Sequence, residues 1–248
     1  MSEISGTRIQ RFWAGHASRP DWGRTIKACL EQIGPIAAEA NLGFVYVTDA
    51  LGDDLGSIVT FLRGHTRIEH WVGTVGMGVC APATEYFDEP AAALMVAALP
   101  PDSFHMLANL ARGIDELDGE ARQWIEKVQP GSGLVHGDPR NANLAELVGD
   151  LSQSAACFLF GGLSSSRGTM AQVADRVHEG GLCGVLFGPS LTIVAGLSQG
   201  CTPIGPVRQV SAADRNIILA LDGQPALDML KADMGEILAR DLNRAAAY

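Results

Sequence analysis

The chain has few basic side chains and no run of them. Of its 248 residues, 18 are Lys or Arg and 28 are Asp or Glu, which gives a formal net charge of −10. A protein that binds a nucleic-acid backbone or an anionic membrane surface ordinarily gathers Lys and Arg into a patch. We therefore expect neither nucleic acid nor membrane as a partner.

Cysteine pairs are lacking as well. The cysteines are odd in number, lie far apart and form no C-x-x-C pair: Cys29, Cys80, Cys157, Cys183 and Cys201. Such scattered cysteines are typical of free thiols in a reducing compartment. Their spacing suggests no metal site, and we expect neither a metal nor another cofactor.

Long apolar runs are also absent. The longest nearly continuous apolar stretch, residues 91–99, is far shorter than the roughly 20 residues of a membrane helix. Residues 1–10 lack the basic flank and apolar core of a signal peptide. With the unpaired cysteines, these features predict a cytoplasmic protein. Hydrophobic residues make up 47% and charged residues 19%, which is typical of a globular protein with a substantial core.

Two segments of the chain have the same order of features. Residues 42–99 and 133–188 each contain a strand ending in Asp, a helix with an apolar stripe, a strand running into glycines, and a third strand. The corresponding positions are Asp49 and Asp138, the expected helix-capping residues Asp54 and Asn143, Leu55 and Leu144, and Gly73 and Gly161. The predicted fold is therefore α/β, with internally duplicated β-α-β-β units, pseudo-two-fold symmetry, and mixed sheets covered by helices.

Further elements are predicted around these units. A helix within residues 21–40 should begin after Asp21 and break at Gly34. A second helix, residues 115–128, should join the two units. After the second unit we expect strands at residues 191–197, 207–210 and 216–221 and a helix from Pro225.

His136, Asp138 and Asn143 have the spacing H-x-D-x-x-x-x-N. In kinase-like phosphotransferases this spacing supplies a base and a magnesium ligand. Here no glycine-rich loop with a strand lysine precedes it, and no D-F-G-like motif follows closely. We prefer the interpretation that Asp138 and Asn143 are turn and helix-capping residues.

The two glycine-rich segments each allow two interpretations. Residues 73–78 reverse the glycine order of a dinucleotide-binding loop and precede no clear helix, so we interpret them as a tight turn or a ligand loop. Residues 161–167 contain three serines and Arg167, which could hold a carboxylate or phosphate, or form a solvated polar loop. Cys201 lies in a turn without a nearby His or Lys, so it is either an exposed thiol or a small buried residue.

The end of the chain resembles the FIST family. The segments Ser198-Gln-Gly-Cys-Thr-Pro-Ile-Gly-Pro206 and Ile217-Ile-Leu-Ala-Leu-Asp-Gly-Gln-Pro-Ala226 are similar to the family's S-Q-G-C-x-P-[IV]-G loop and L-D-G-x-P-A-L element. Residues 73–78 and 160–162 resemble its glycine turns, and the resemblance covers about residues 12–230. It implies a sensory module that binds a small ligand, with amino acids suggested, often beside signal-transduction domains. It implies no catalytic residues.

The resemblance also sets the expected domains. Residues 1–221 should be the FIST N-terminal-like sensory domain and residues 222–248 the start of a C-terminal-like segment, either truncated or a natural short form. A stripe of Leu, Met and Ile follows the helix expected at residues 225–247 and would pack on the body or on a second copy in a homo-oligomer. Because no output domain is apparent, a signalling protein is an expected partner.

The expected function is a small-ligand-binding sensory domain of signal transduction, whose ligand is an amino acid or another small anionic metabolite. The candidate ligand-binding residues lie in the glycine-rich segments, in the turn at residues 198–206 and at strand ends: Thr74, Ser164, Ser165, Arg167, Cys201, Asp49 and Asp138. An anion would contact Arg167 and the loop N–H groups. Two alternatives remain: a hydrolase that uses Cys201 or Ser164/Ser165, and an interaction scaffold that docks through the Pro225 helix.

Overall fold

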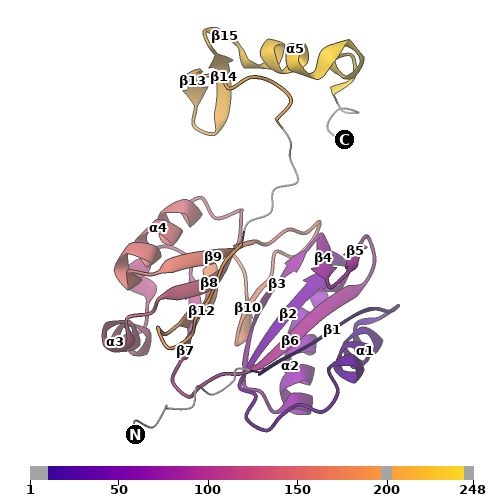
Figure 1. Cartoon of the computed structure of the whole chain (residues 1–248), viewed down its shortest axis with the longest axis vertical. Helices are drawn as coiled ribbons and strands as arrows, with labels where there is room; N and C mark the ends of the chain where they lie inside the picture. Colours follow the sequence, from indigo (N-terminus) through magenta and orange to yellow (C-terminus); the bar gives the residue numbers. More distant parts are fainter. Residues whose placement is uncertain (1–10, 197–202, 243–248) are drawn as a thin grey trace, which may run out of the picture. The chain divides into compact units, whose positions relative to one another are not determined.

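The computed structural model describes residues 11–196 and 203–242 (Figure 1). The chain divides into two compact units, Met1–Ala195 and Gly196–Tyr248. The first unit contains helices α1 (Trp22–Ile33), α2 (Leu55–Thr66), α3 (Gly119–Val128) and α4 (Leu144–Ala155), with 3-10 helices at Asp49–Asp54 and Ile114–Glu116. Its strands are β1 (Arg11–Ser18), β2 (Leu42–Thr48), β3 (His70–Gly76), β4 (Gly78–Ala81), β5 (Thr84–Phe87), β6 (Ala91–Ala98), β7 (Phe104–Leu110), β8 (Ser132–Gly137), β9 (Phe158–Leu163), β10 (Gln172–Ala174), β11 (Arg176–His178) and β12 (Leu182–Phe187).

Two main sheets are each covered by helices on their outer face. The first sheet has the strand order β1-β6-β2-β3-β10-β11, and the second has the order β7-β12-β8-β9. The core between the first sheet and its helices includes Ile26 and Ile58, from α1 and α2. The core of the second includes Ile125 and Leu147, from α3 and α4. Figure 1 shows these helix pairs beyond opposite sheets.

The inner faces of the two sheets pack against each other. Phe44 of β2 and Leu134 of β8 belong to this inter-sheet core, whereas Val45 and Val47 of β2 face the helices. Side chains alternate between the faces of a strand, and a strand that is buried on both faces is apolar throughout. The first unit therefore has four layers, helix–sheet–sheet–helix, and confirms the predicted α/β class with mixed sheets covered by helices.

The predicted repeat units have matching strand orders. In the first, β2 and β3 are parallel and β6 lies antiparallel beside β2; in the second, β8 and β9 are parallel and β12 lies antiparallel beside β8. One strand crosses between them, because β10 of the second segment pairs with β3 of the first. A duplication with a pseudo-two-fold axis stays a prediction.

Local signals for helices and long strands are confirmed. α1 begins after Asp21, whose carboxylate accepts a hydrogen bond from the Arg24 N–H at 2.9 Å, and it ends at Gly34. The helix that joins the units begins at Gly119, after the cap residue Asp118, and is shorter than predicted. Strands β1 and β7 and the pairs β4–β5 and β10–β11 are not among the predicted elements.

Three predictions are wrong in detail. Asp54 and Asn143 precede α2 and α4, but neither side chain makes a capping hydrogen bond. The Asn143 N–H instead donates to the side chain of Asn141 at 2.8 Å. Residues 191–196 form no strand among the described positions, and the strand expected at residues 207–210 begins only at its last residue.

The second unit is a small three-stranded sheet with one helix. Its ion pair between Arg208 and Asp233 spans 2.6 Å. Gly235, with φ 78°, interrupts its helix, so the continuous helix predicted over residues 225–247 is wrong. The domain boundary expected after residue 221 stays a prediction. The elements are β13 (Val210–Asp214), β14 (Ile217–Leu221), β15 (Gln224–Pro225) and α5 (Ala226–Ala239).

Across residues 11–196 and 203–242, none of the helices combines the length and the apolar character needed to cross a membrane.

Candidate functional site

The first glycine-rich segment is mostly strand rather than the predicted turn. β3 continues through Gly76 and β4 begins at Gly78, which leaves Met77 between them. Gly73 meets a close backbone approach, since a Cβ there would lie 1.7 Å from the carbonyl oxygen of Val45 on the neighbouring parallel strand. No other residue type fits between two strands at this distance.

The second glycine-rich segment contains the same close approach. A Cβ on Gly161 would lie 1.9 Å from the carbonyl oxygen of Val135, its register partner in the parallel strand β8. Gly161 also has φ 140°, which L side chains rarely adopt. Glycine therefore lets β3 lie close to β2, and β9 close to β8, shortly before the loops that follow β3 and β9.

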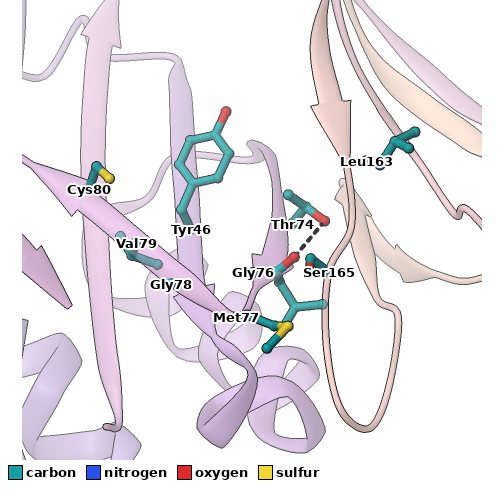
Figure 2. A pocket seen from close by; sticks show the side chains of 10 residues that line it. Tyr46, Thr74, Gly76, Met77, Gly78, Val79, Cys80, Leu163 and Ser165 are labelled. Carbon is teal, nitrogen blue, oxygen red and sulfur yellow. Dashed lines mark hydrogen bonds between the residues drawn. The ribbon is translucent and has the colours of Figure 1, made fainter. Parts of the chain in front are cut away.

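A cavity of about 490 Å³ lies at these strand ends. Figure 2 shows its wall, to which β3 and β4 contribute most residues; the end of β9 contributes Leu163, and the loop after it contributes Ser165. The Ser165 N–H donates to the Val75 carbonyl at 3.2 Å, which ties the second loop to β3. The structure thus brings both predicted glycine-rich segments to one cavity. We call it the glycine cavity; its wall consists of Tyr46, Thr74, Val75, Gly76, Met77, Gly78, Val79, Cys80, Leu163 and Ser165.

Buried hydroxyl groups connect the two segments behind this wall. The side-chain oxygens of Thr74 and Ser164 are 2.7 Å apart, and the Gln172 amide donates to Ser164 at 2.7 Å. Thr74 also donates to the Ala171 carbonyl at 3.1 Å. Thr74 and Ser164 therefore have their hydrogen-bonding capacity largely satisfied inside the protein. Ser165 is exposed, and its hydroxyl has no hydrogen-bond partner among the described residues.

Tyr46 and His136 extend this buried polar layer. The Tyr46 hydroxyl lies 3.2 Å from Nε2 of His136, and their rings meet edge to face. His136 is 2% exposed, and burial lowers its pKa to about 4, while burial raises the pKa of Tyr46 to about 12. Nδ1 of His136 and Oε1 of Gln172 are buried without a partner among the described residues. Such orphaned atoms are typical of sites that hold a water or a ligand group.

Arg167 lies at the edge of this region in a network with two carboxylates. Its guanidinium contacts Asp49 at 2.7 Å and Asp88 at 2.6 Å. The hydrogen bonds from Arg167 lower the pKa of Asp49. Arg167 and Asp49 were both predicted to contact the ligand. The structure brings them together, but they form an ion pair with each other. An incoming anion would compete with both carboxylates.

Asp138 has an equivalent arrangement in the second segment. Its side chain is fully buried and forms an ion pair with Arg140 at 2.6 Å. It also accepts a hydrogen bond from the Gly180 N–H at 2.8 Å. The hydrogen bonds from Arg140 lower the pKa of Asp138 to about 2. Asp138 does not line the glycine cavity. Its observed role is to hold the turns after β8 and before β12.

The remaining predicted residue, Cys201, lies outside the described residues. Sequence reasoning missed Tyr46, His136 and Gln172 as members of the polar layer. It also missed Cys80, an exposed free thiol on the cavity wall. One signal was present, because Tyr46 and His136 each interrupt an apolar strand with a polar group at an inward position. Within the described part of the chain, no three His, Cys, Asp or Glu side chains are arranged to hold a metal ion.

Comparison with known families decides the identity of this fold. The family model described as FIST N domain matches residues 41–224, which is more than half of the chain. The chain belongs to the FIST family. The FIST domain is a sensory domain of signal transduction, so the resemblance seen in the sequence is confirmed.

Two curated relatives of this FIST protein come from Mycobacterium tuberculosis: uncharacterized protein MT0656 of strain CDC 1551 and uncharacterized protein Rv0628c of strain H37Rv. Each is 32% identical over 169 residues, which cover 64% of this chain and 42% of the relative. The FIST chain therefore aligns with less than half the length of either relative. Neither name assigns a ligand or an activity.

Proposed function

We propose that the chain is a small-ligand-binding sensory domain and that the glycine cavity is its ligand site. The observation that carries this proposal is the meeting of the two glycine-rich segments in one cavity at strand carboxyl ends. Ligand sites of α/β proteins commonly lie beyond the carboxyl ends of parallel strands. A volume of about 490 Å³ suits a small metabolite.

The chemistry of the wall limits how a ligand would bind. Ser165 offers a hydroxyl without a hydrogen-bond partner among the described residues, and Gly76 and Gly78, on either side of Met77, place backbone without a side chain at the wall. No Asp, Glu, Lys or Arg side chain is among the lining residues. Amino acids and small anions, the ligands expected from the family, would bind here through hydrogen bonds rather than through an ion pair, unless they displaced Arg167 from its carboxylates.

Thermal-shift measurements with a panel of amino acids, carboxylates and uncharged metabolites test this site. Leu163→Trp fills the cavity from an exposed position on β9, and Ser165→Ala removes the available hydroxyl. The matched controls are Phe158→Trp, an exposed position on β9 that does not line the cavity, and Ser57→Ala on the exposed side of α2. We expect the cavity variants to lose the response to a hit and the controls to keep it. Equal responses in all four would place the ligand elsewhere.

The hydrolase alternative is less well supported. Ser164 is held by Thr74 and Gln172, and neither side chain can act as a general base. Ser165 has no His or Lys as a hydrogen-bond partner among the described residues. Cys201 lies outside them.

A role for α5 in docking to a signalling partner or a second copy rests on its exposed side chains. Leu227 and Leu230 are 50% and 45% exposed. Light scattering on the whole chain and on a chain ending at Gly223 tests this proposal. We expect the shorter chain to lose self-association, and an unchanged mass would remove α5 from consideration. A cytoplasmic location is part of the same proposal and is tested by cell fractionation.

A further inference from the structure

A second cavity, about 410 Å³ in volume, lies between the two sheets and is lined almost entirely by apolar side chains. The first sheet contributes Phe44 and Met95, and the second contributes Leu134 and Phe160. Among its lining residues, Tyr46 and Thr192 alone carry a side-chain oxygen. We call this space the inter-sheet cavity. A cavity of this composition favours hydrocarbon or an aromatic ring over a polar ligand.

The inner face of the first sheet changes from polar to apolar along the strands. Tyr46 pairs in register with Thr74, and Thr74 with Gln172, which forms a polar row across three strands. Two residues earlier on β2, Phe44 pairs with Val72 and begins an apolar row. Since the strand rise is about 3.3 Å per residue, the change occurs over roughly 7 Å.

The facing sheet has the same gradient. His136 lies opposite Tyr46, and two residues earlier on β8 Leu134 pairs with Phe160 and with Val185. Polar groups thus face polar groups, and apolar groups face apolar groups, at two adjacent levels between the sheets. A molecule that lay along the strands would meet hydroxyl and amide groups at one end and hydrocarbon at the other.

Tyr46 lies at the boundary between the polar row and the apolar row. It lines the glycine cavity, the inter-sheet cavity and a third cavity of about 340 Å³ that shares Phe44 and Met95 with the inter-sheet cavity and Cys80 with the glycine cavity. Three adjoining spaces therefore share one aromatic ring.

No charged side chain is among the residues that line these three spaces. None of the residues that line them is Asp, Glu, Lys or Arg, and His16, at the third cavity, is the lone histidine among them. A carboxylate, phosphate or ammonium group buried here would have no side chain of opposite charge, and such burial is costly. The wall therefore selects against a ligand whose buried part carries a charge.

We propose that the glycine cavity and the inter-sheet cavity form one site for an uncharged amphipathic small molecule. The polar end lies against Ser165 and the backbone of residues 76–78, and the hydrocarbon or aromatic part lies between Phe44, Met95, Leu134 and Phe160. Tyr46 lies between the two ends. This inference rests on the proposed ligand-binding function and names the chemical class of the ligand.

Binding of a 1-alkanol series to the full chain, from 1-butanol to 1-octanol, tests the proposal by saturation-transfer NMR and calorimetry. We expect affinity to increase roughly fourfold for each added methylene group until the inter-sheet cavity is filled, because each buried CH₂ adds a constant increment. Octanoate and octylammonium, which carry a charged end on a similar chain, should bind at least tenfold more weakly than 1-octanol. Equal binding of 1-butanol and 1-octanol, or tighter binding of octanoate, would overturn the proposal.

Met95→Trp locates the hydrocarbon part, because the indole would fill the inter-sheet cavity. Met106→Trp is its matched control, since Met106 lines a different cavity, between β7 and β10–β11. We expect Met95→Trp to abolish the chain-length dependence and Met106→Trp to keep it. Should Met95→Trp fail to fold, Ile193→Trp enters the same cavity from a more exposed position.

The same measurements separate this inference from the proposed function. A charged metabolite whose binding is lost in Leu163→Trp but kept in Met95→Trp would leave the proposed ligand site intact and refute the amphipathic ligand. Alkanol binding that is lost in Met95→Trp but unaffected by Leu163→Trp and Ser165→Ala would refute the joint site. In that case the inter-sheet cavity binds hydrocarbon by itself.

Discussion

The Tyr46 hydroxyl lies 3.2 Å from Nε2 of the buried His136 and so joins the inner faces of the two sheets by a hydrogen bond between polar side chains. The surrounding inter-sheet core is otherwise rich in Leu, Val and Phe. A hydrogen bond in such surroundings is strong, and the loss of one partner leaves a costly buried polar group. The contact therefore adds a polar link to the apolar packing that holds the two inner faces together.

His136 should make stability depend on pH. Its folded-state pKa of about 4 lies below the ordinary 6.5 because burial disfavours the imidazolium. A depressed pKa contributes stability above pH 6.5 that is lost as the pH falls toward 4, since the unfolded chain takes up the proton first. The loss should be at most about 3 kcal/mol. Urea unfolding of the wild type and His136→Gln from pH 7 to pH 4 measures it.

In that experiment His136→Gln keeps a hydrogen-bonding group beside Tyr46 but cannot titrate. Its stability should fall less between pH 7 and pH 4 than that of the wild type. Parallel curves for the two proteins would contradict a neutral, buried imidazole. The other histidines contribute equally to both proteins and cancel in the comparison.

Asp138→Asn should destabilise the fold at neutral pH. The change removes the charge that binds Arg140 and weakens the acceptor of the Gly180 N–H. Since the pKa of Asp138 is lowered from 3.8 to about 2, the carboxylate contributes about 2 kcal/mol above pH 4, and this contribution is lost as the pH falls to 2. Chemical denaturation at pH 7 and at pH 2.5 should show a large and then a small difference from the wild type. A difference independent of pH would assign the effect to packing instead.

Gly73→Ala and Gly161→Ala should each cost about 3 kcal/mol or more, because the new methyl group would overlap a backbone carbonyl on the neighbouring strand. Gly64→Ala is the matched control: Gly64 lies on α2, and a Cβ there meets no atom within 4 Å. That substitution should stabilise the protein by about 0.5–1 kcal/mol. Thermal unfolding followed by circular dichroism measures all three. Full stability in Gly73→Ala would contradict the close approach of β2 and β3.

Arg167→Ala should raise the pKa of Asp49 toward its ordinary value. The hydrogen bonds from Arg167 are the largest cause of the lowered pKa of Asp49. Carboxyl-carbon NMR titration of Asp49 in the wild type and the variant tests this. Arg24→Ala, at an exposed position on α1, serves as the control and should leave the titration unchanged. An unaltered pKa in Arg167→Ala would mean that Arg167 is free to hold an anion.

Much of the fold followed from periodicity. The apolar stripe of Leu55, Ile58, Val59 and Leu62 predicted α2, and all four side chains are buried. The strand at residues 91–99 was apparent because it is apolar on both faces. β10 was not predicted, since it has three residues, one of them Gln172, and its place depends on a partner strand far away in the chain.

The site was predictable to the level of segments but not of side chains. The candidate ligand-binding residues were placed in two glycine-rich stretches, and both stretches contribute to one cavity. The sequence could not show that Arg167 would be bound by Asp49 and Asp88, because Asp88 belongs to the loop after β5. Nor could it show that Tyr46 faces His136, since that requires the stacking of two sheets formed by different segments.

The pairing of β10 with β3 has a consequence for synthesis on the ribosome. The free side of β3 acquires its partner strand only when residues 172–174 have emerged. Until then the nascent chain presents an open strand edge, a known nucleus for incorrect association. The amino-terminal half therefore cannot complete its sheet alone. A gene split between the two halves would yield an amino-terminal fragment whose sheet lacks β10 and β11, whereas the strands of the second sheet all lie in the other fragment.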